Sequence, residues 1–163
     1  LRRLLTSDTL PLPRGFGPRL WQRQGVFVTL KKRGTLRGCI GRIPPHAPLA
    51  PLVGAMAFSA ALEDPRFQPV TAAELEGLTI EISVLTPPHR IARPSEIVVG
   101  RDGVLLKSGP NAAVYLPQVA TEQGWGRGQM LDSLCEKAGL DAGCWRQGAE
   151  LAVFQAEVFH EGE

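Results

Sequence analysis

A short apolar run broken by two glycines, Leu36-Arg37-Gly38-Cys39-Ile40-Gly41, most constrains the fold of this chain. Side chains alternate between the two faces of a β-strand, so Arg37, Cys39 and Gly41 are expected to share one face. Glycine inside a strand often marks a close approach to the backbone. The run therefore predicts a sparsely covered strand face that carries a thiol and a cation, with Gly38 and Gly41 as candidate binding positions.

A β-hairpin is predicted around this run. Residues 25–31 read Gly-Val-Phe-Val-Thr-Leu-Lys and are rich in β-branched and aromatic residues, which is typical of a strand. Arg33-Gly34 supplies a turn, and residues 35–41 return as the second strand. The two strands should pair antiparallel.

A helix and a strand follow the hairpin. Residues 48–62 place apolar side chains at helical spacing after a proline-rich corner, and the helix should end at Asp64-Pro65-Arg66-Phe67. Residues 71–74 have the form of a capping box. Residues 78–85 alternate apolar and polar, which predicts a half-buried strand with Glu81 on the face away from the core.

Pro87-Pro88 marks the best candidate boundary in the chain. The elements expected after it are strands at 96–99, 103–107 and 112–116, a short helix from Pro117, a helix at 129–138 and a final strand at 151–159.

Composition and charge narrow the class of protein. The chain has 163 residues and a net charge of +2, which is too weak to indicate nucleic-acid binding. No apolar stretch approaches the length of a membrane span. Cys39, Cys135 and Cys144 match no disulfide framework or zinc motif, so a cytoplasmic protein with free thiols is the simplest expectation.

The beginning of the chain gives two smaller expectations. The basic and apolar start, Leu1–Leu5, is too short for a signal peptide and looks like the tail of a helix that begins earlier. Residues 7–24 are rich in proline and glycine, which predicts an ordered loop attached to the body by Phe16, Leu20 and Trp21.

Seven sequence blocks in one order resemble the AMMECR domain family, known in bacteria and archaea as component A of the AmmeMemoRadiSam system. The matching blocks are Gly25-Val26-Phe27-Val28-Thr29-Leu30, Leu36-Arg37-Gly38-Cys39-Ile40-Gly41, Asp64-Pro65-Arg66-Phe67, Ile80-Glu81-Ile82-Ser83-Val84-Leu85-Thr86-Pro87, Leu116-Pro117-Gln118-Val119-Ala120, Gly124-Trp125 and Lys137-Ala138-Gly139-Leu140. Together they cover most of the chain, so the match is specific.

The resemblance implies a two-lobed α+β fold with a single AMMECR-like domain over residues 1–163. We expect a larger lobe, an antiparallel sheet packed by helices, from residues 1–86 plus 147–163, and a smaller mixed lobe from residues 87–146. The family's Leu-Arg-Gly-Cys-Ile-Gly motif is expected at a cleft between them. The family name implies genomic association with a Memo-like protein and a radical SAM protein, and the family's function is unknown.

Cys39 has two readings. By strand geometry the Arg37 guanidinium would lie about 6.5–7 Å away, and a cation at that range favours the reactive thiolate. Alternatively, Cys39 is a small half-buried hydrophobic side chain in a closely packed strand, which is the commoner use of cysteine.

The charged candidate residues also have two interpretations each. Asp64 and Arg66 could clamp a carboxylate or phosphate, or form a structural ion pair after the helix, which we favour. Glu81 could look into the expected cleft and serve as a general base, or simply meet water.

Gln118 and Trp125 complete the candidate binding residues. Trp125 could line the cleft or anchor a lobe, and we favour the anchor because large aromatic side chains dominate core packing. His46, His89 and His160 are scattered, so no metal site is predicted. No cofactor-binding motif is present either.

Three functions remain open on the sequence alone. The preferred one is a cytoplasmic accessory protein that docks with partners and presents the Cys39 cleft to a shared small molecule or peptide. The second is an enzyme that uses Cys39 with Arg37 and Glu81 on a small molecule. The third, against which the modest charge argues, is a nucleic-acid-binding regulator.

Overall fold

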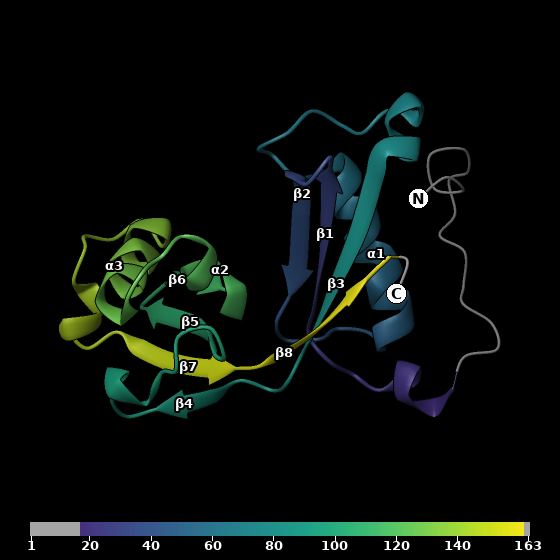
Figure 1. Cartoon of the computed structure of the whole chain (residues 1–163). Helices are drawn as coiled ribbons and strands as arrows, with labels where there is room; N and C mark the ends of the chain where they lie inside the picture. Colours follow the sequence, from purple (N-terminus) through teal and green to yellow (C-terminus); the bar gives the residue numbers. More distant parts are fainter. Residues whose placement is uncertain (1–16, 162–163) are drawn as a thin grey trace. The chain divides into compact units, whose positions relative to one another are not determined.

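The computed structural model describes residues 17–161, which divide into two compact units (Figure 1). Unit 1 contains the chain up to Leu85 together with the segment from Glu157, and unit 2 runs from Thr86 to Ala156. Each unit has its own sheet and its own hydrophobic core. The expected α+β fold with antiparallel sheets is confirmed.

The unit 1 sheet has the strand order β2-β1-β3-β8, so β2 lies at an edge. Its strands are β1 (Val26–Lys32), β2 (Thr35–Arg42), β3 (Leu78–Leu85) and β8 (Ala156–His160). β1 pairs antiparallel with both β2 and β3, which confirms the predicted hairpin. The register of β2 shifts after Leu30, where Lys31 lies opposite Leu36, so Arg37 is the extra residue of a β-bulge.

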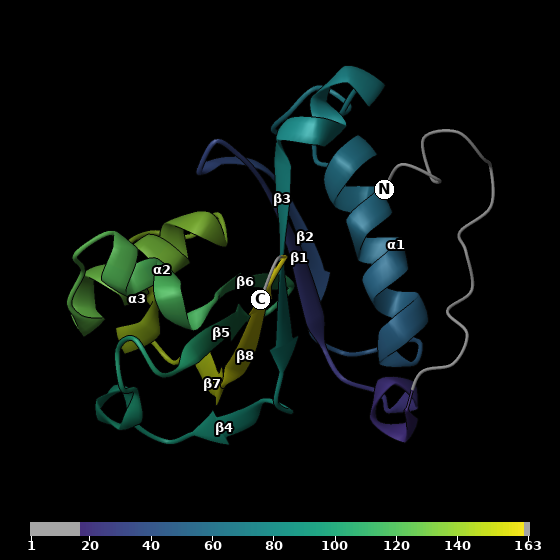
Figure 2. The same ribbon diagram turned by 45° about the vertical axis from the view of Figure 1, so that its right-hand side comes forward.

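Helix α1 (Leu49–Leu62) packs along one face of this sheet, as both ribbon views show (Figures 1 and 2). Its apolar positions and the inward side chains of β1 form the core of unit 1, with Ile40 and alternate residues of β3 packed against it. The predicted strand at 78–85 is thus confirmed with its inward and outward faces as expected. Glu81 and Ser83 lie on the face turned away from α1.

A short 3-10 helix, η2 (Ala72–Gly77), connects α1 to β3, and the capping box expected at Thr71 and Glu74 is present. Another, η1 (Pro18–Trp21), precedes β1. Leu20 packs against the core, as expected, whereas Trp21 is 47% exposed. Leu1–Leu5 and Phe16 lie outside the described residues.

Unit 2 has a second sheet with the strand order β4-β7-β5-β6. The strands are β4 (His89–Ile91), β5 (Gly103–Ser108), β6 (Asn111–Tyr115) and β7 (Glu150–Phe154). Helices α2 (Pro117–Glu122) and α3 (Arg127–Lys137) contribute buried side chains to its core. Two 3-10 turns, η3 (Pro94–Glu96) and η4 (Cys144–Arg146), complete it.

Three expectations differ from the structure in this half of the chain. Residues 96–99 do not form a strand, because η3 and a turn that binds Asp102 occupy this segment. The single strand expected at 151–159 is two strands, β7 and β8, which belong to different sheets. Residues 147–156, which we assigned to the larger lobe, lie in unit 2 because β7 pairs with β4 and β5.

Within residues 17–161, no helix combines the length and the apolar character needed to cross a membrane.

Candidate functional site

Cys39 lies in the edge strand β2 and faces away from α1. Its partner across the strand pair is Thr29 of β1, whose hydroxyl donates a hydrogen bond to the Cys39 Sγ over 3.2 Å. Cys39 is half-buried and takes no part in a disulfide. A hydroxyl donor stabilises negative charge on sulfur, so this contact favours the thiolate.

The glycines of the motif are required by packing. A Cβ at Gly38 would lie 2.0 Å from the backbone oxygen of Ala60 in α1, so glycine lets the helix lie directly on the strand. A Cβ at Gly41 would lie 2.2 Å from the Phe27 ring. The strand face beside Cys39 is therefore less bare than the sequence suggested, because the Phe27 ring covers Gly41.

Asp64 and Arg66 close the free edge of β2 at Cys39. The Cys39 N–H donates to Asp64 Oδ2 over 2.9 Å, and Arg66 Nη2 donates to the Cys39 carbonyl over 3.2 Å. Arg66 also pairs with Asp64 through two hydrogen bonds of 2.9 and 2.7 Å. The ion pair thus replaces a neighbouring strand at the one residue that carries the thiol.

The electrostatics of this pair agree with its geometry. The hydrogen bonds from Arg66 lower the pKa of Asp64 from 3.8 to about 2, despite the opposing effect of burial. The pKa of Arg66 is raised, chiefly by the hydrogen-bonded Asp64 carboxylate and to a smaller degree by the charge of Cys39. Arg66 is therefore a cation that interacts with Cys39.

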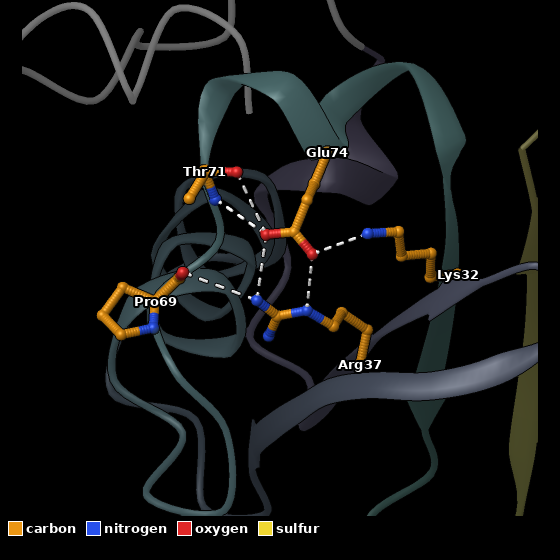
Figure 3. Close-up of polar contacts among 5 residues, drawn as sticks. All are labelled: Lys32, Arg37, Pro69, Thr71 and Glu74. Atoms are coloured by element: carbon orange, nitrogen blue, oxygen red, sulfur yellow. Dashed lines mark hydrogen bonds and ion pairs between the residues drawn. The ribbon is translucent and has the colours of Figure 1, made fainter.

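Arg37, which we expected to act on Cys39, forms its hydrogen bonds with a carboxylate of η2. Its Nε and Nη2 each donate to the Glu74 carboxylate over 3.1 Å, as Figure 3 shows. Glu74 also accepts from Lys32 over 3.0 Å and from the backbone N–H of Thr71 over 3.0 Å. The pKa of Glu74 is lowered, first by the Arg37 hydrogen bonds. The bulge breaks the alternation at Arg37, and this side chain holds η2.

Glu81 lies two strands from Cys39. Thr29 pairs with Cys39 on one side and with Glu81 on the other, which puts Cys39 and Glu81 about 10 Å apart across the sheet. That separation is too long for Glu81 to take a proton from the Cys39 thiol directly. Glu81 is 7% exposed and pairs with Lys31 at 2.9 Å and with His160 Nδ1 at 3.5 Å.

Two further polar side chains, Thr29 and Ser83, lie on this face, and neither was named as a site residue from the sequence. Both are buried, and the Ser83 Oγ has no hydrogen-bond partner within the described part of the chain. A buried hydroxyl without a partner is uncommon in folded proteins. The strand alternation could have placed both on this face, since Thr29 follows the pattern of β1 and Ser83 that of β3.

The remaining candidates belong to unit 2. Gln118 lies half-buried in the first turn of α2. Trp125 packs against the unit 2 core and contacts the Tyr115 ring at a centroid distance of 5.9 Å, which agrees with an anchoring role.

Cys135 and Cys144 form a disulfide between α3 and η4, which corrects the expectation of free thiols at these two positions. Their sequence spacing of 9 residues gave no sign of this, because the pairing depends on how η4 folds back against α3. Over residues 17–161, no three His, Cys, Asp or Glu side chains gather in a way that could hold a metal ion.

Comparison with known proteins identifies related chains. The AMMECR1 family model matches residues 2–159. A protein of Thermococcus onnurineus is 43% identical over 94% of this chain and 80% of its own length. Protein PF1979 of Pyrococcus furiosus is 41% identical over 97% of this chain and 80% of its own length.

A solved structure shows the same fold. The crystal structure of the uncharacterised protein PH0010 from Pyrococcus horikoshii matches with a TM-score of 0.94 and 39% identity, over 99% of this chain and 85% of that one. The sequence blocks, the fold and these relatives agree. The chain therefore belongs to the AMMECR1 family.

Proposed function

We propose that this protein is an accessory component that holds a small molecule or peptide at the Cys39 face of the unit 1 sheet and presents it to a partner protein. The observation that carries the proposal is the hydrogen bond from Thr29 to the Cys39 Sγ at 3.2 Å, on a half-buried thiol. A thiol that is both reachable and stabilised as a thiolate suits covalent or polar contact with a bound molecule.

The rest of the face supports a polar ligand. Ser83 offers a buried hydroxyl without a partner in residues 17–161, and Glu81 a buried carboxylate. A polar group that gains a hydrogen bond from a ligand recovers the desolvation cost of its burial. Apolar packing alone would not select these residue types at neighbouring positions of one sheet face.

The choice of partner rests on family membership. A Memo-like protein is the first candidate and a radical SAM protein the second, both in the cytoplasm. A cleft between the two lobes beside Cys39 stays a prediction of the family resemblance.

Protection of Cys39 from alkylation tests the docking proposal. Purified protein is treated with iodoacetamide with and without the Memo-like protein of the same organism, and modification is followed by intact mass. Because the other two cysteines are disulfide-bonded, the reagent reports on Cys39 alone. We expect at least a roughly tenfold slower reaction in the complex, equivalent to about 1.4 kcal/mol. An unchanged rate at saturating partner, with serum albumin as the control, would reject the proposal.

A cysteine-dependent enzyme is the second candidate, favoured by the attraction between Cys39 and Arg66. In this case the Sγ would attack an acyl carbon, form a thioester and expel the leaving group, and water would then release the acid. Loss of turnover in Cys39→Ser at an unchanged melting temperature would support it, whereas turnover that survives the substitution would exclude it.

A further inference from the structure

A cavity lies within unit 2. It has a volume of about 440 Å³ and is lined by the residues of and after β4, by η4 and by the start of β7. Small-molecule sites commonly fall in the range of about 300–1,000 Å³ and combine apolar walls with a few polar groups. All of its lining residues belong to unit 2, so the cavity is complete within this unit.

Two arginines border the cavity from different elements. Arg90 of β4 has a side chain that is 73% exposed, and Arg146 of η4 one that is 59% exposed. Their present partners are surface carboxylates, Glu150 at 3.2 Å and Asp132 at 3.5 Å. Exposed ion pairs of this kind contribute little to stability. A ligand anion can therefore replace either carboxylate at a small cost in free energy.

Trp145 gives the cavity a fixed planar wall. Its indole N–H donates to Asp132 over 2.7 Å, and the Arg146 guanidinium stacks over the ring at 3.9 Å. The neighbouring Cys144 is bonded to Cys135, which is fully buried in α3. The indole is thus held in place before any ligand arrives, which lowers the entropic cost of binding.

Apart from Glu150, the rest of the lining is small or apolar. Ile91, Ala149 and Leu151 supply hydrocarbon surface. Gly148 has a φ of +91°, and a Cβ there would meet no atom within 4 Å. The cavity is therefore unobstructed at Gly148.

We propose that this cavity is a binding site for a small aromatic carboxylate. The ring would lie along the Trp145 wall, and the carboxylate would be held by Arg146 and Arg90, because the guanidinium fork matches a carboxylate in two parallel hydrogen bonds. Glu150 and Asp132 balance the two arginines, so a monoanion that takes the place of Glu150 at Arg90 fits this charge better than a phosphate dianion does.

Titration with benzoate tests the proposal on the intact protein. The indole N–H signal of Trp145, assigned with Trp145→Phe, is followed by NMR. We expect a saturable shift, and about tenfold weaker binding in both Arg146→Met and Arg90→Met, since one charge-assisted contact is lost in each. Arg93→Met is the matched control, an exposed arginine of the same segment outside the cavity lining. Its affinity should stay within about twofold of the native value.

The proposal would be overturned if the shift did not saturate up to about 10 mM benzoate, or if the uncharged analogue benzamide bound as tightly as benzoate. It would also be overturned if Arg93→Met weakened binding as much as Arg146→Met does, or if inorganic phosphate bound more tightly than benzoate. Both cavity arginines are largely exposed, so the variants should fold, and their melting temperatures check that point.

Discussion

Strand β2 carries two ion pairs that differ in what they bind, one at Cys39 and the other at Arg37. Each of these ends has an arginine near the Phe67 ring, Arg66 at 5.5 Å and Arg37 at 6.0 Å, and each arginine pairs with a carboxylate. At the Cys39 end, the pair binds the backbone of the thiol residue. At the Arg37 end, the pair holds η2 to the hairpin and touches no candidate reactive group.

This difference teaches that the nearest charge in sequence need not be the nearest charge in space. A single bulge residue turns Arg37 toward Glu74, and a loop that follows α1 brings Arg66 to Cys39. We therefore propose that the Arg66–Asp64 pair influences the Cys39 thiol as well as stability, whereas the Arg37–Glu74 pair contributes to stability alone. The variants below test that division, beginning with the residue between the two ends.

Gly38→Ala should have the largest effect. A Cβ would lie 2.0 Å from the Ala60 backbone oxygen, so either α1 or β2 must shift. We expect a loss of about 3 kcal/mol in the free energy of unfolding, measured by urea denaturation. Gly77→Ala, where the added carbon meets nothing within 4 Å, is the control. A stability loss in Gly38→Ala no larger than in this control would mean that the helix does not rest on the strand.

Asp64→Asn should lower the free energy of unfolding by about 2–3 kcal/mol, because it removes the charge that pairs with Arg66 and replaces one acceptor oxygen with an NH2 donor that faces other donors. The pH dependence has a definite sign. With the folded-state pKa lowered from 3.8 to about 2, the carboxylate stabilises the native state above pH 4 and loses this contribution as the pH falls through 2.

The variant should therefore lose less stability than the native protein between about pH 4 and 2, as measured by thermal melts at each pH. Glu74, whose pKa is also lowered, remains as a second source of acid sensitivity in both proteins. Identical acid profiles would show that Asp64 does not interact with Arg66 as described.

Arg37→Met should lower stability by about 1–2 kcal/mol through loss of the hydrogen bonds to Glu74. The alkylation rate of Cys39 should remain within about twofold of the native rate, because Arg37 faces η2. Calorimetry gives the first quantity and intact mass the second. A stable Arg37→Met protein with a slow thiol would restore the arrangement expected from the sequence.

Thr29→Val should have the smallest effect. It removes the hydroxyl that donates to Cys39 Sγ while conserving shape, and we expect alkylation to slow by about 2–5-fold near neutral pH. Thr29→Ser keeps the donor and should retain most of the native rate. Equal rates in the two variants would show that the hydroxyl has no influence on the sulfur.

The sequence was sufficient to predict the elements whose residue pattern lies within the element itself. Strand β3 was predicted from end to end because its alternation is strict, and α1 and the capping box at Thr71 carry local signals as well. The bulge at Arg37 carries no such signal. It depends on the pairing of β2 with β1, and that pairing decides which face each side chain takes.

Several residues of the candidate site could be named from the sequence, but the contacts that they make could not. Cys39, Asp64 and Arg66 were named from the sequence and share hydrogen bonds, whereas Arg37 and Glu81 pair with other residues of unit 1 and Gln118 and Trp125 belong to unit 2. The Thr29 contact follows only from the strand register. The Cys135–Cys144 bond depends on how η4 packs against α3, which no spacing rule gives.

The most direct test of the account is the pH dependence of Cys39 alkylation in Arg66→Met beside Arg37→Met, with Arg42→Met as an exposed control on the same strand. If Arg66 is the cation that stabilises the thiolate, the alkylation profile of Arg66→Met alone should move to higher pH. A profile that moves in Arg37→Met and stays in place in Arg66→Met would contradict the account.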